Sequence, residues 1–392
     1  MHDVFIVAGQ RTAIGDFGKS LKDIPPTKLG EIAIRAALKA GGIEAAEIQH
    51  VVMGNVIHTE PRDAYISRVA AVDAGIPIET PALTVNRLCG SGLQAIITAA
   101  QTIMLGDADI TIGGGAESMS RGGYLLPNER WGARLGDGKV MDMVVGALHD
   151  PFGHGHMGIT AENIATRYQI TRDEQDAFSL ESHRRAAYAI ANGYFTSQIT
   201  PVELPSRKGP IEFTTDEHVR DDISAEKLGT LKPAFKKDGS VTAGNASGLN
   251  DAGAAVVLMS AAQVTRRNTK PMARIVAYGH AGVDPNYMGL GPVPASQIAL
   301  KKAGLTASDI DIVESNEAFA AQACAVSRDL GLEPAKVNPN GGAIALGHPI
   351  GASGAIIAIK AMYELHRTQK RYALATMCIG GGQGIALILE RV

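Results

Sequence analysis

The chain has 392 residues, of which 45% are hydrophobic and 20% are charged, and its formal net charge is −3. This balance is typical of a soluble protein, and the length predicts two or three domains rather than one simple core. No long run of Lys or Arg occurs, which argues against nucleic acid or an anionic membrane as a partner.

The N-terminal segment predicts a strand rather than a targeting signal. The apolar stretch VFIVAG begins at Val4, and we find no signal peptide, transit peptide or transmembrane stretch. The three cysteines, Cys89, Cys324 and Cys378, argue against a disulfide framework and for a reducing compartment. We therefore expect a cytoplasmic enzyme or binding protein.

An internal repeat organises the chain. ALKAGGIEAAEI at 37–48 is similar to ALKKAGLTASDI at 299–310, an offset of 262 residues. At the same offset, CGSG at 89–92 corresponds to GASG at 351–354, and small or branched apolar residues of helical character follow both. The repeat predicts a duplicated α/β unit with alternating strands and helices.

A third match needs a small insertion. DITIGGGAES at 109–118 parallels LATMCIGGGQG at 374–384, which places Thr111 opposite Cys378. In a fold with a pseudo-twofold axis, equivalent loops of the two copies meet at their interface. We therefore expect the segments around Cys89 and Cys378 to converge on one site.

Composition changes between the two copies. Residues 119–248 are richer in charge, proline and aromatic residues, and include Trp131, the single tryptophan. A helix is predicted over about 171–192, with Thr171 as its N-cap, and an apolar strand near 254–259 returns to the first copy. The predicted domains are 1–118 with 249–270, an inserted loop domain over 119–248, and a C-terminal half over 271–392.

Cys89 lies between an extended segment, PALTVNRL, and the helical run LQAIITAA. The N–H groups at the start of a helix favour negative charge, which predicts a lowered pKa for the thiol and a nucleophilic role. The alternative is a buried structural cysteine, because free cysteine is among the most buried residue types. This stretch alone leaves both interpretations open.

Three segments of the second half contain polar residues in glycine-rich surroundings. They are NEAFAA at 316–321, GGAIALGHPIGASG at 341–354 and CIGGGQG at 378–384. Taken singly, His348 is interpreted as a structural turn residue and Asn316 as a helix cap. Taken together they lie at strand ends, where α/β folds place active sites. His348 is then a base for a thiol nucleophile, a second thiol removes a proton α to a carbonyl, and backbone N–H groups hold an oxyanion.

The motifs VNRLCGSGLQA, GGGAESMS, HMGITAEN, NEAFAAQ, NPNGGAIALGHPIGASG and TMCIGGGQG resemble those of the thiolase family, in the family's order. The resemblance covers essentially the whole chain and is greatest to bacterial acetyl-CoA acetyltransferases and short-chain β-ketothiolases. It implies an α/β thiolase-like fold, in which duplicated mixed-sheet halves form α-β-α-β-α layers with an inserted loop domain.

The resemblance also implies the catalytic roles. Cys89 matches the nucleophile, His348 the group that activates it, and Cys378 the acid/base at the α-carbon. Asn316 matches the residue that holds a water, which forms one oxyanion hole with His348; the N–H groups of Cys89 and Gly380 form the other. Acetyl-CoA is then donor and acceptor in a ping-pong Claisen condensation, with thiolysis as the reverse. No cofactor or metal is expected, because the coenzyme A thioesters are the substrates.

A further set of residues matches the family's coenzyme A site. The partners implied are acetyl-CoA, acetoacetyl-CoA, other short 3-ketoacyl-CoAs and CoA, and a homotetramer is expected. Cys324 matches no catalytic position and is predicted to lie in the core. The residues that match the coenzyme A site are His156, Met157, Arg220, Ser247, Met288, Ala318 and Phe319.

Four alternatives remain to be weighed. The nearest is a degradative 3-ketoacyl-CoA thiolase that prefers longer chains, which shares the catalytic residues. A decarboxylating condensing enzyme of the superfamily would place a histidine where Cys378 stands. A non-catalytic acyl-CoA or lipid-binding relative would be expected to lose a catalytic residue, and a cysteine hydrolase would have no need of Cys378. Chain-length preference, physiological direction, regulation and subunit number do not follow from the sequence.

Overall fold

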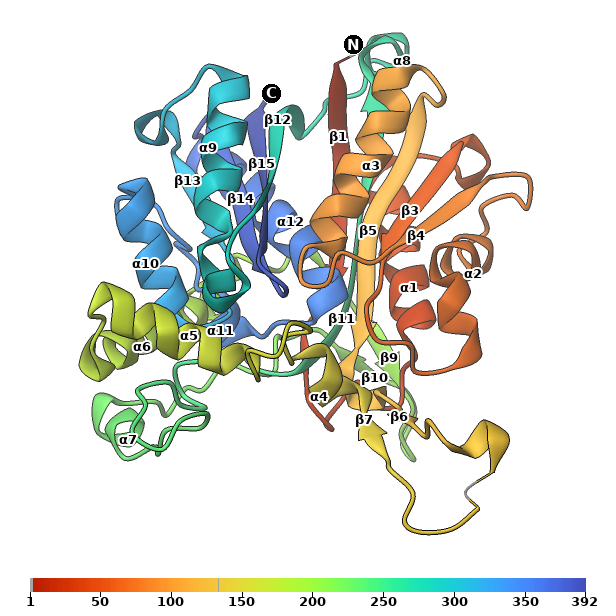
Figure 1. Ribbon diagram of the computed structural model, residues 1–392. Coiled ribbons are helices and arrows are strands. Elements are labelled where there is room, and N and C mark those ends of the chain that lie inside the picture. The colour runs from red at the N-terminus through yellow and green to blue at the C-terminus, as the bar shows by residue number, and fades with distance from the viewer. Residues whose placement is uncertain (1–2, 133) are drawn as a thin grey trace.

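Two mixed β-sheets, one from each copy of the repeat, form the framework of the computed structural model, which describes residues 3–132 and 134–392 (Figure 1). The first has the strand order β4-β3-β5-β11-β1. In it β3 is parallel to both neighbours, and β11 is antiparallel to β5 and β1. The strands are β1 (Val4–Thr12), β3 (His50–Gly54), β4 (Ala82–Val85), β5 (Ile110–Ser118) and β11 (Asn250–Ser260), with the short β2 (Gly15–Asp16) beside β11 and β8 (Ile199–Thr200) beside β1.

The second sheet has the order β13-β14-β15-β12 and repeats the same pattern of directions. β13 is parallel to β14, and the other pairs are antiparallel. A short pairing of Phe5 and Ile6 with Arg274 and Ala273 joins β1 to β12 and makes the two sheets continuous. The strands are β12 (Ala273–Gly282), β13 (Ile312–Ser315), β14 (Tyr372–Ile379) and β15 (Gln383–Arg391).

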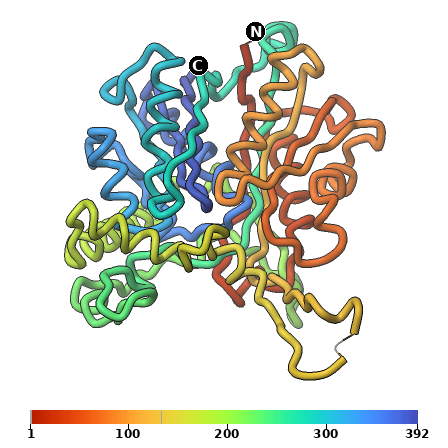
Figure 2. Tube along the Cα trace, viewed as in Figure 1, coloured from red at the N-terminus to blue at the C-terminus, as the bar shows by residue number. Residues whose placement is uncertain are grey.

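Helices form three layers around the two sheets (Figures 1 and 2). α1 (Pro26–Gly41) and α2 (Ile66–Asp73) cover the outer face of the first sheet, and α9 (Pro292–Ala303) covers that of the second. α3 (Ser91–Leu105) and α12 (Ile350–Thr368) pack together between the sheets, and their apolar side chains join both sheets in one core. The predicted α-β-α-β-α layering is confirmed.

The two central helices, α3 and α12, cross closely, and the contact lies at an equivalent glycine in each copy of the repeat. A Cβ on Gly92 would lie 2.7 Å from the backbone N of Ala355, and one on Gly354 would lie 2.2 Å from that of Leu93. Gly92 and Gly354, like Leu93 and Ala355, are 262 residues apart, so each helix presents the same glycine to its counterpart. Glycine permits this approach because it has no Cβ.

The predicted correspondence of Thr111 and Cys378 is wrong. Met53 of β3 pairs with Gly114 of β5, and Ser315 of β13 pairs with Thr376 of β14. Both pairs obey the offset of 262 without an insertion, so Cys378 corresponds to Ala116. The glycine runs of the two segments have similar sequences, but they occupy non-equivalent positions in the two sheets.

The segment between β5 and β11 lies across the lower ends of both sheets in Figure 1. The predicted helix over 171–192 is confirmed as α6 (Arg172–Ala191), whose N-cap Thr171 accepts a hydrogen bond from the backbone N–H of Glu174 at 3.2 Å. The strand predicted near 254–259 is the inner part of β11. The other elements here are α4 (Met143–Ala147), α5 (Met157–Tyr168), α7 (Ala225–Gly229), β6 (Tyr124–Leu125), β7 (Met141–Asp142), β9 (Val202–Leu204) and β10 (Ile211–Phe213).

Short helices complete the connections. Those of α type are α8 (Ala261–Arg267), α10 (Ala320–Leu330) and α11 (Ala343–Leu346). The 3-10 turns are η1 (Ala45–Glu47), η2 (Pro61–Tyr65), η3 (Met119–Arg121), η4 (Glu129–Trp131), η5 (Pro285–Leu290) and η6 (Ala307–Asp309). Within the described residues, the segment Leu88–Leu105 is long and apolar enough to cross a membrane, but it consists of the central helix α3 and the turn before it, and the helix packs inside the core.

Candidate active site

A cavity of about 50 Å³ lies where the turns before α3 and α12 meet the end of β14. It gathers nine of the twelve residues that the sequence singled out. It also gathers four that sequence reasoning missed, all apolar and therefore without a distinctive signal. The predicted residues are Cys89, Met157, Ser247, Met288, Ala318, Phe319, His348, Cys378 and Gly380, and the additional ones are Leu88, Ala147, Leu148 and Ile350.

The turn that presents Cys89 is held by local hydrogen bonds. Leu88 adopts a left-handed backbone conformation with φ 45°, which is rare for a residue with a side chain. Its N–H donates to Oδ1 of Asn86 at 2.9 Å. Ser91 Oγ accepts from the Arg87 N–H at 2.9 Å and donates to the Leu88 carbonyl at 2.6 Å. These contacts stabilise the strained turn immediately before the cysteine.

The Cys89 thiol is protonated in the resting site. Burial raises its pKa to about 11, although the N–H groups of Gly380 and of Cys89 itself act in the opposite direction. The expectation of a lowered pKa at a helix N-terminus is therefore wrong, because loss of solvent outweighs the helix and its N–H groups. Those two N–H groups are the same pair that the family resemblance assigned to an oxyanion hole.

His348 precedes α12 and is held as a neutral imidazole. Its Nδ1 lies 2.6 Å from Ser353 Oγ, which itself donates to the Pro349 carbonyl at 2.9 Å. Ser353 therefore accepts from Nδ1–H, which leaves the Nε2 lone pair free to take a proton. Burial lowers the pKa of His348 to about 4, so the ring is uncharged at neutral pH. Its backbone N–H donates to Asn250 Oδ1 at 2.9 Å.

Cys378 is the penultimate residue of β14 and is 1% exposed. Burial, and secondarily the nearby Cys89, raise the pKa of its thiol well above the ordinary value. Two neutral thiols and a neutral imidazole thus face one cavity. Gly381 and Gly382, with φ of 79° and 83°, turn the chain sharply after Gly380 and lead it into β15.

Asn316 lies behind His348 rather than in the cavity lining. Its amide Nδ2 is 3.5 Å from Nε2 of His348, and its backbone N–H donates to the Thr376 carbonyl at 3.0 Å. It does not cap a helix, because α10 begins at Ala320 with Phe319 as its N-cap. Of the two interpretations of Asn316, the structure therefore supports the one that pairs it with His348.

The turn that contains Asn316 is supported by the next residue, Glu317. Its buried carboxylate accepts from Ser182 Oγ at 2.7 Å, from Asn338 Nδ2 at 2.7 Å and from the Ile344 N–H at 3.2 Å. These bonds tie the turn to α6 of the inserted segment and to the glycine-rich stretch before His348. Glu317 follows Asn316 directly in NEAF, but no sequence pattern revealed its partners.

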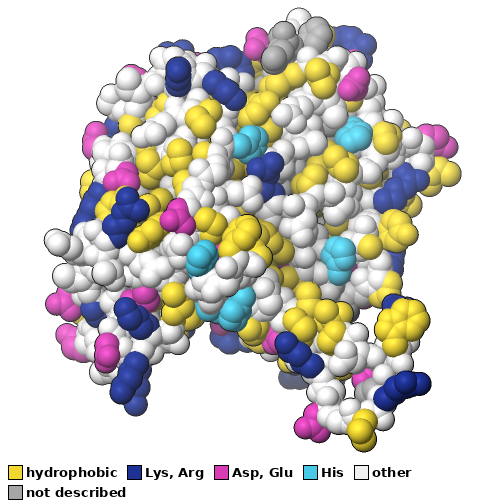
Figure 3. All heavy atoms as spheres, viewed as in Figure 1, with side chains coloured by type: hydrophobic (Ala, Val, Ile, Leu, Met, Phe, Trp, Pro, Cys, Tyr) yellow, Lys and Arg dark blue, Asp and Glu magenta, His cyan; other side chains and the backbone are white. Residues whose placement is uncertain are grey.

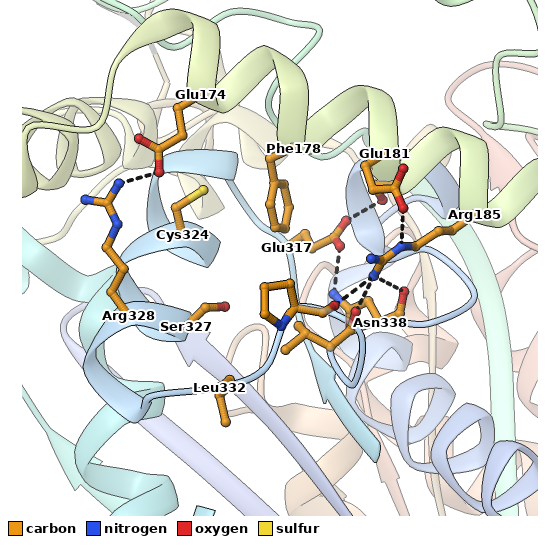
Figure 4. A pocket seen from close by; sticks show the side chains of 13 residues that line it. Glu174, Phe178, Glu181, Arg185, Glu317, Cys324, Ser327, Arg328, Leu332 and Asn338 are labelled. Atoms are coloured by element: carbon orange, nitrogen blue, oxygen red, sulfur yellow. Dashed lines mark hydrogen bonds and ion pairs between the residues drawn. The ribbon is translucent and has the colours of Figure 1, made fainter. Parts of the chain in front are cut away.

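A larger cavity, of about 320 Å³, lies on the other side of Glu317, between α6 and α10 (Figure 4). Phe178 and Cys324 contribute to its wall, and the ion pairs Glu174–Arg328 and Glu181–Arg185 flank it. Burial raises the pKa of Cys324 to about 12, and no histidine lines the cavity. Cys324 is buried, as predicted, and it has no histidine beside it in this cavity to act as its base.

Glu117 connects the two halves beneath the site and was missed by sequence reasoning. Its carboxylate accepts from the N–H groups of Val56 at 3.1 Å, Ile57 at 3.1 Å and Gly351 at 2.9 Å. Burial raises its pKa to about 8. Glu117 is a charged residue at the end of the glycine-rich strand, in GGGAES, and this unusual position was the sequence feature that could have indicated its role.

His156 and Arg220 lie outside the cavity lining. His156 caps α5, where Nδ1 accepts from the Gly158 N–H at 3.0 Å, and its ring stacks on Phe235 with centroids 4.6 Å apart. Phe235 in turn contacts Phe319 edge-on, so His156 belongs to the wall behind the cavity. Arg220 is exposed, and its backbone N–H donates to His183 Nδ1 at 3.2 Å. Among the described residues, no group of His, Cys, Asp and Glu could hold a metal ion.

Comparison with known proteins gives a consistent result over the whole chain. Residues 4–262 match the family described as "Thiolase, N-terminal domain" and residues 269–391 match "Thiolase, C-terminal domain". The chain is 63% identical to "Beta-ketothiolase BktB" of Cupriavidus necator over 391 residues, which cover 100% of this chain and 99% of that protein. It is 50% identical to "Acetyl-CoA acetyltransferase" of Pseudomonas aeruginosa, with 100% of both chains covered.

Solved structures agree with the sequence relatives. The acetyl-CoA acetyltransferase of Bacillus anthracis superposes with a TM-score of 0.98 at 47% identity, covering 100% of this chain and 99% of that one. Human mitochondrial 3-ketoacyl-CoA thiolase in complex with CoA superposes with a TM-score of 0.97 at 46% identity, covering 100% and 98%.

Proposed function

The chain belongs to the thiolase family, and on that premise we propose that it is a β-ketothiolase, an acetyl-CoA C-acetyltransferase. It joins two acyl-CoA thioesters into a 3-ketoacyl-CoA and CoA, and it cleaves the product in reverse. The observation that carries this proposal is the single cavity that contains Cys89, His348 and Cys378.

The first half-reaction transfers an acyl group to Cys89. Nε2 of His348 accepts the thiol proton as the sulfur attacks the thioester carbonyl of the first acyl-CoA. The neutral state of both groups at rest fits this order, because the proton moves only when the electrophile arrives. The N–H groups of Cys89 and Gly380 hold the oxyanion, the carbon–sulfur bond to CoA breaks, and the CoA thiolate takes the proton from His348.

The second half-reaction forms the carbon–carbon bond. Nε2 of His348 takes the proton of the Cys378 thiol, and the Cys378 thiolate removes a proton from the α-carbon of a second acetyl-CoA. The Nε2–H of the protonated His348 and a water on Asn316 hold the enolate oxygen. The α-carbon attacks the acyl group on Cys89, the bond to Cys89 breaks, and the thiolate leaves. His348 gives its proton to the Cys89 sulfur and Cys378 keeps the α-proton, so all three groups regain their starting states. The chemistry uses only the thioesters and these side chains, and we propose no cofactor or metal.

We propose that coenzyme A binds between the inserted segment and the core. Met157 and Met288 would contact the acyl group and Ser247 the pantetheine, since all three line the cavity beside the catalytic residues. Ala318 and Phe319 complete the wall, with His156 behind it. Arg220 would contact the nucleotide end, and its exposed position is compatible with a flexible side chain that meets a phosphate at the mouth of the site.

We further propose a cytoplasmic homotetramer. The arm that carries β6 and β7 projects from the body of the molecule (Figures 1 and 3) and exposes Tyr124, Leu126, Trp131 and Leu135. Trp131 is 86% exposed and Leu135 is 100% exposed, an arrangement that favours burial against another subunit. The domain division at 118, 248 and 270 stays a prediction.

The proposed function is tested by CoA-dependent thiolysis of acetoacetyl-CoA, 3-ketovaleryl-CoA and a long-chain 3-ketoacyl-CoA, measured side by side. We expect the two short substrates to be cleaved and the long one to be cleaved much more slowly. Equal cleavage of the long substrate would identify a degradative enzyme instead. Cleavage of none of the three would contradict the assignment of the substrate class.

A further inference from the structure

A third, small cavity, of about 20 Å³, lies next to the partners of His348. Asn316 and Ser353, which lie beside its two ring nitrogens, both line this cavity. Neither Cys89 nor Cys378 lines it, so it is separate from the cavity in which the reaction is proposed to occur. Its remaining polar groups have no role in the mechanism described above.

The first of these groups is a buried ion pair. Lys360, in the middle of α12, lies 2.7 Å from Oε2 of Glu314 in β13, and its Nζ also donates to the Gly341 carbonyl at 2.6 Å. The two side chains are 3% and 1% exposed. A buried ion pair contributes little to stability compared with an apolar pair of the same size, because both charges lose their water. Stability alone is therefore a poor reason for its presence.

The second observation is that a buried oxygen atom of a residue lining this cavity has no protein partner. It is Oε1 of Glu314, whose other carboxylate oxygen binds Lys360. Buried polar atoms are nearly always hydrogen-bonded, and where the protein offers no partner an ordered water supplies it. An orphaned carboxylate oxygen, an ammonium group and the partners of the catalytic histidine thus belong to the residues around one small cavity.

We propose that ordered water in this cavity links Glu314 to Asn316 and Ser353, and that the Lys360–Glu314 pair is a positioning element for His348. The inference rests on the proposed function, since it assigns these residues to the same reaction. Lys360 fixes the carboxylate, the carboxylate fixes the water, and the water restrains the two residues that orient the imidazole. This water is distinct from the oxyanion-hole water on the catalytic side of Asn316.

The first test is a crystal structure of the full-length wild-type protein at a resolution that shows ordered water. We expect a water within hydrogen-bonding distance of Glu314 Oε1, connected to Asn316 or Ser353. A dry cavity, or side chains that pair directly with each other, would overturn the proposal. This test requires no activity, so it remains decisive even if the wild-type protein cleaves no 3-ketoacyl-CoA and the proposed function fails.

The second test separates positioning from stability. The double variant Glu314→Leu/Lys360→Met replaces the pair by apolar side chains, which keeps the fold stable but removes the water's anchor. In thiolysis of acetoacetyl-CoA, we expect kcat to fall about tenfold or more while KM stays within about twofold of the wild type, because the substrate site is untouched and only His348 is displaced.

The variant Glu314→Gln/Lys360→Met keeps an amide oxygen where the carboxylate was, and we expect it to recover most of kcat. Asp63→Asn is the matched control, because Asp63 is also a buried carboxylate with an unpartnered oxygen and lines none of the three cavities. We expect it to alter stability and leave kcat unchanged. Equal kcat in the wild type and in both double variants would overturn the positioning role.

Discussion

The starts of α3 and α12 show how one duplicated turn became two different parts of a site. At the offset of 262 residues, Ser91 corresponds to Ser353 and Asn86 corresponds to His348. In the first half Ser91 and Asn86 bind backbone groups and hold the turn before Cys89. In the second half Ser353 accepts from the imidazole of His348. The same serine therefore supports a nucleophile in one copy and orients a base in the other.

The duplication accounts for the backbone framework that the two halves share, and residue differences between the halves account for the reactive groups. Cys89 has Gly351 as its counterpart, and Cys378 has Ala116. Neither half contains a complete set of catalytic groups. The cavity becomes reactive only where the two unlike turns meet, so variants in each half are expected to fail in different ways.

The largest effect is expected for Cys89→Ala in the first half. Without the sulfur no acyl-enzyme forms, and thiolysis falls by about a thousandfold or more. Mass spectrometry after incubation with acetyl-CoA should show an acetyl adduct on the wild type and none on the variant. An adduct of equal yield on the variant would place the nucleophile elsewhere.

Cys378→Ala in the second half should separate the two half-reactions. Acylation of Cys89 remains, whereas condensation falls by about a hundredfold or more, because no group takes the α-proton. The acetyl adduct and the rate of acetoacetyl-CoA formation measure the two steps. Cys324→Ala is the matched control and should leave both unchanged; normal condensation by Cys378→Ala would refute the assigned base.

Gly92→Ala and Gly354→Ala test the symmetric crossing of the central helices. Each added Cβ meets the backbone of the opposite helix, 2.7 Å from Ala355 N or 2.2 Å from Leu93 N. Overpacking of this kind lowers the free energy of unfolding by about 1–3 kcal/mol, and the second variant should lose more. Urea denaturation measures the loss, and Gly229→Ala, whose Cβ meets nothing within 4 Å, is the control.

Ser353→Ala sharpens the contrast between the two serines. It removes the acceptor for Nδ1–H of His348, so the ring loses its orientation, and we expect kcat to fall about tenfold with acylation slowed. Ser91→Ala should instead weaken the turn before Cys89 and reduce stability. Stopped-flow acylation and thermal melts compare the two variants; identical profiles would argue against distinct roles.

The smallest expected effect is a shift of the acid limb of kcat/KM to lower pH. Because burial lowers the pKa of His348 to about 4, the base stays neutral well below pH 6.5, the ordinary value for histidine. The acid limb of kcat/KM should therefore lie below pH 6. In folding, the unfolded chain binds a proton at this residue between pH 6.5 and 4 and the folded chain does not, so stability falls as pH falls through that window. An acid limb centred at pH 6.5 or above would contradict the neutral, buried imidazole.

The sequence by itself determined the repeat, the α/β class, the family and the residues with reactive side chains. It could do so because these features are local: glycine-rich turns at strand ends, a cysteine before a helix, and a fixed spacing between copies. The layered order followed from the duplication and the resemblance together. Even the returning strand and the long helix of the inserted segment were marked by local apolar runs and a cap.

Only the tertiary structure decided how those groups behave. The register of β5 and β14 shows that Ala116, and not Thr111, corresponds to Cys378. Strand pairing depends on the neighbouring strands and not on local sequence similarity. Burial by residues from both halves raised the pKa of Cys89 where the helix end alone predicted the opposite. The groups that hold the turn around Asn316 through Glu317 are Ser182 of α6 and Asn338, and they come from distant segments. Contacts between distant segments leave no local pattern from which to predict them.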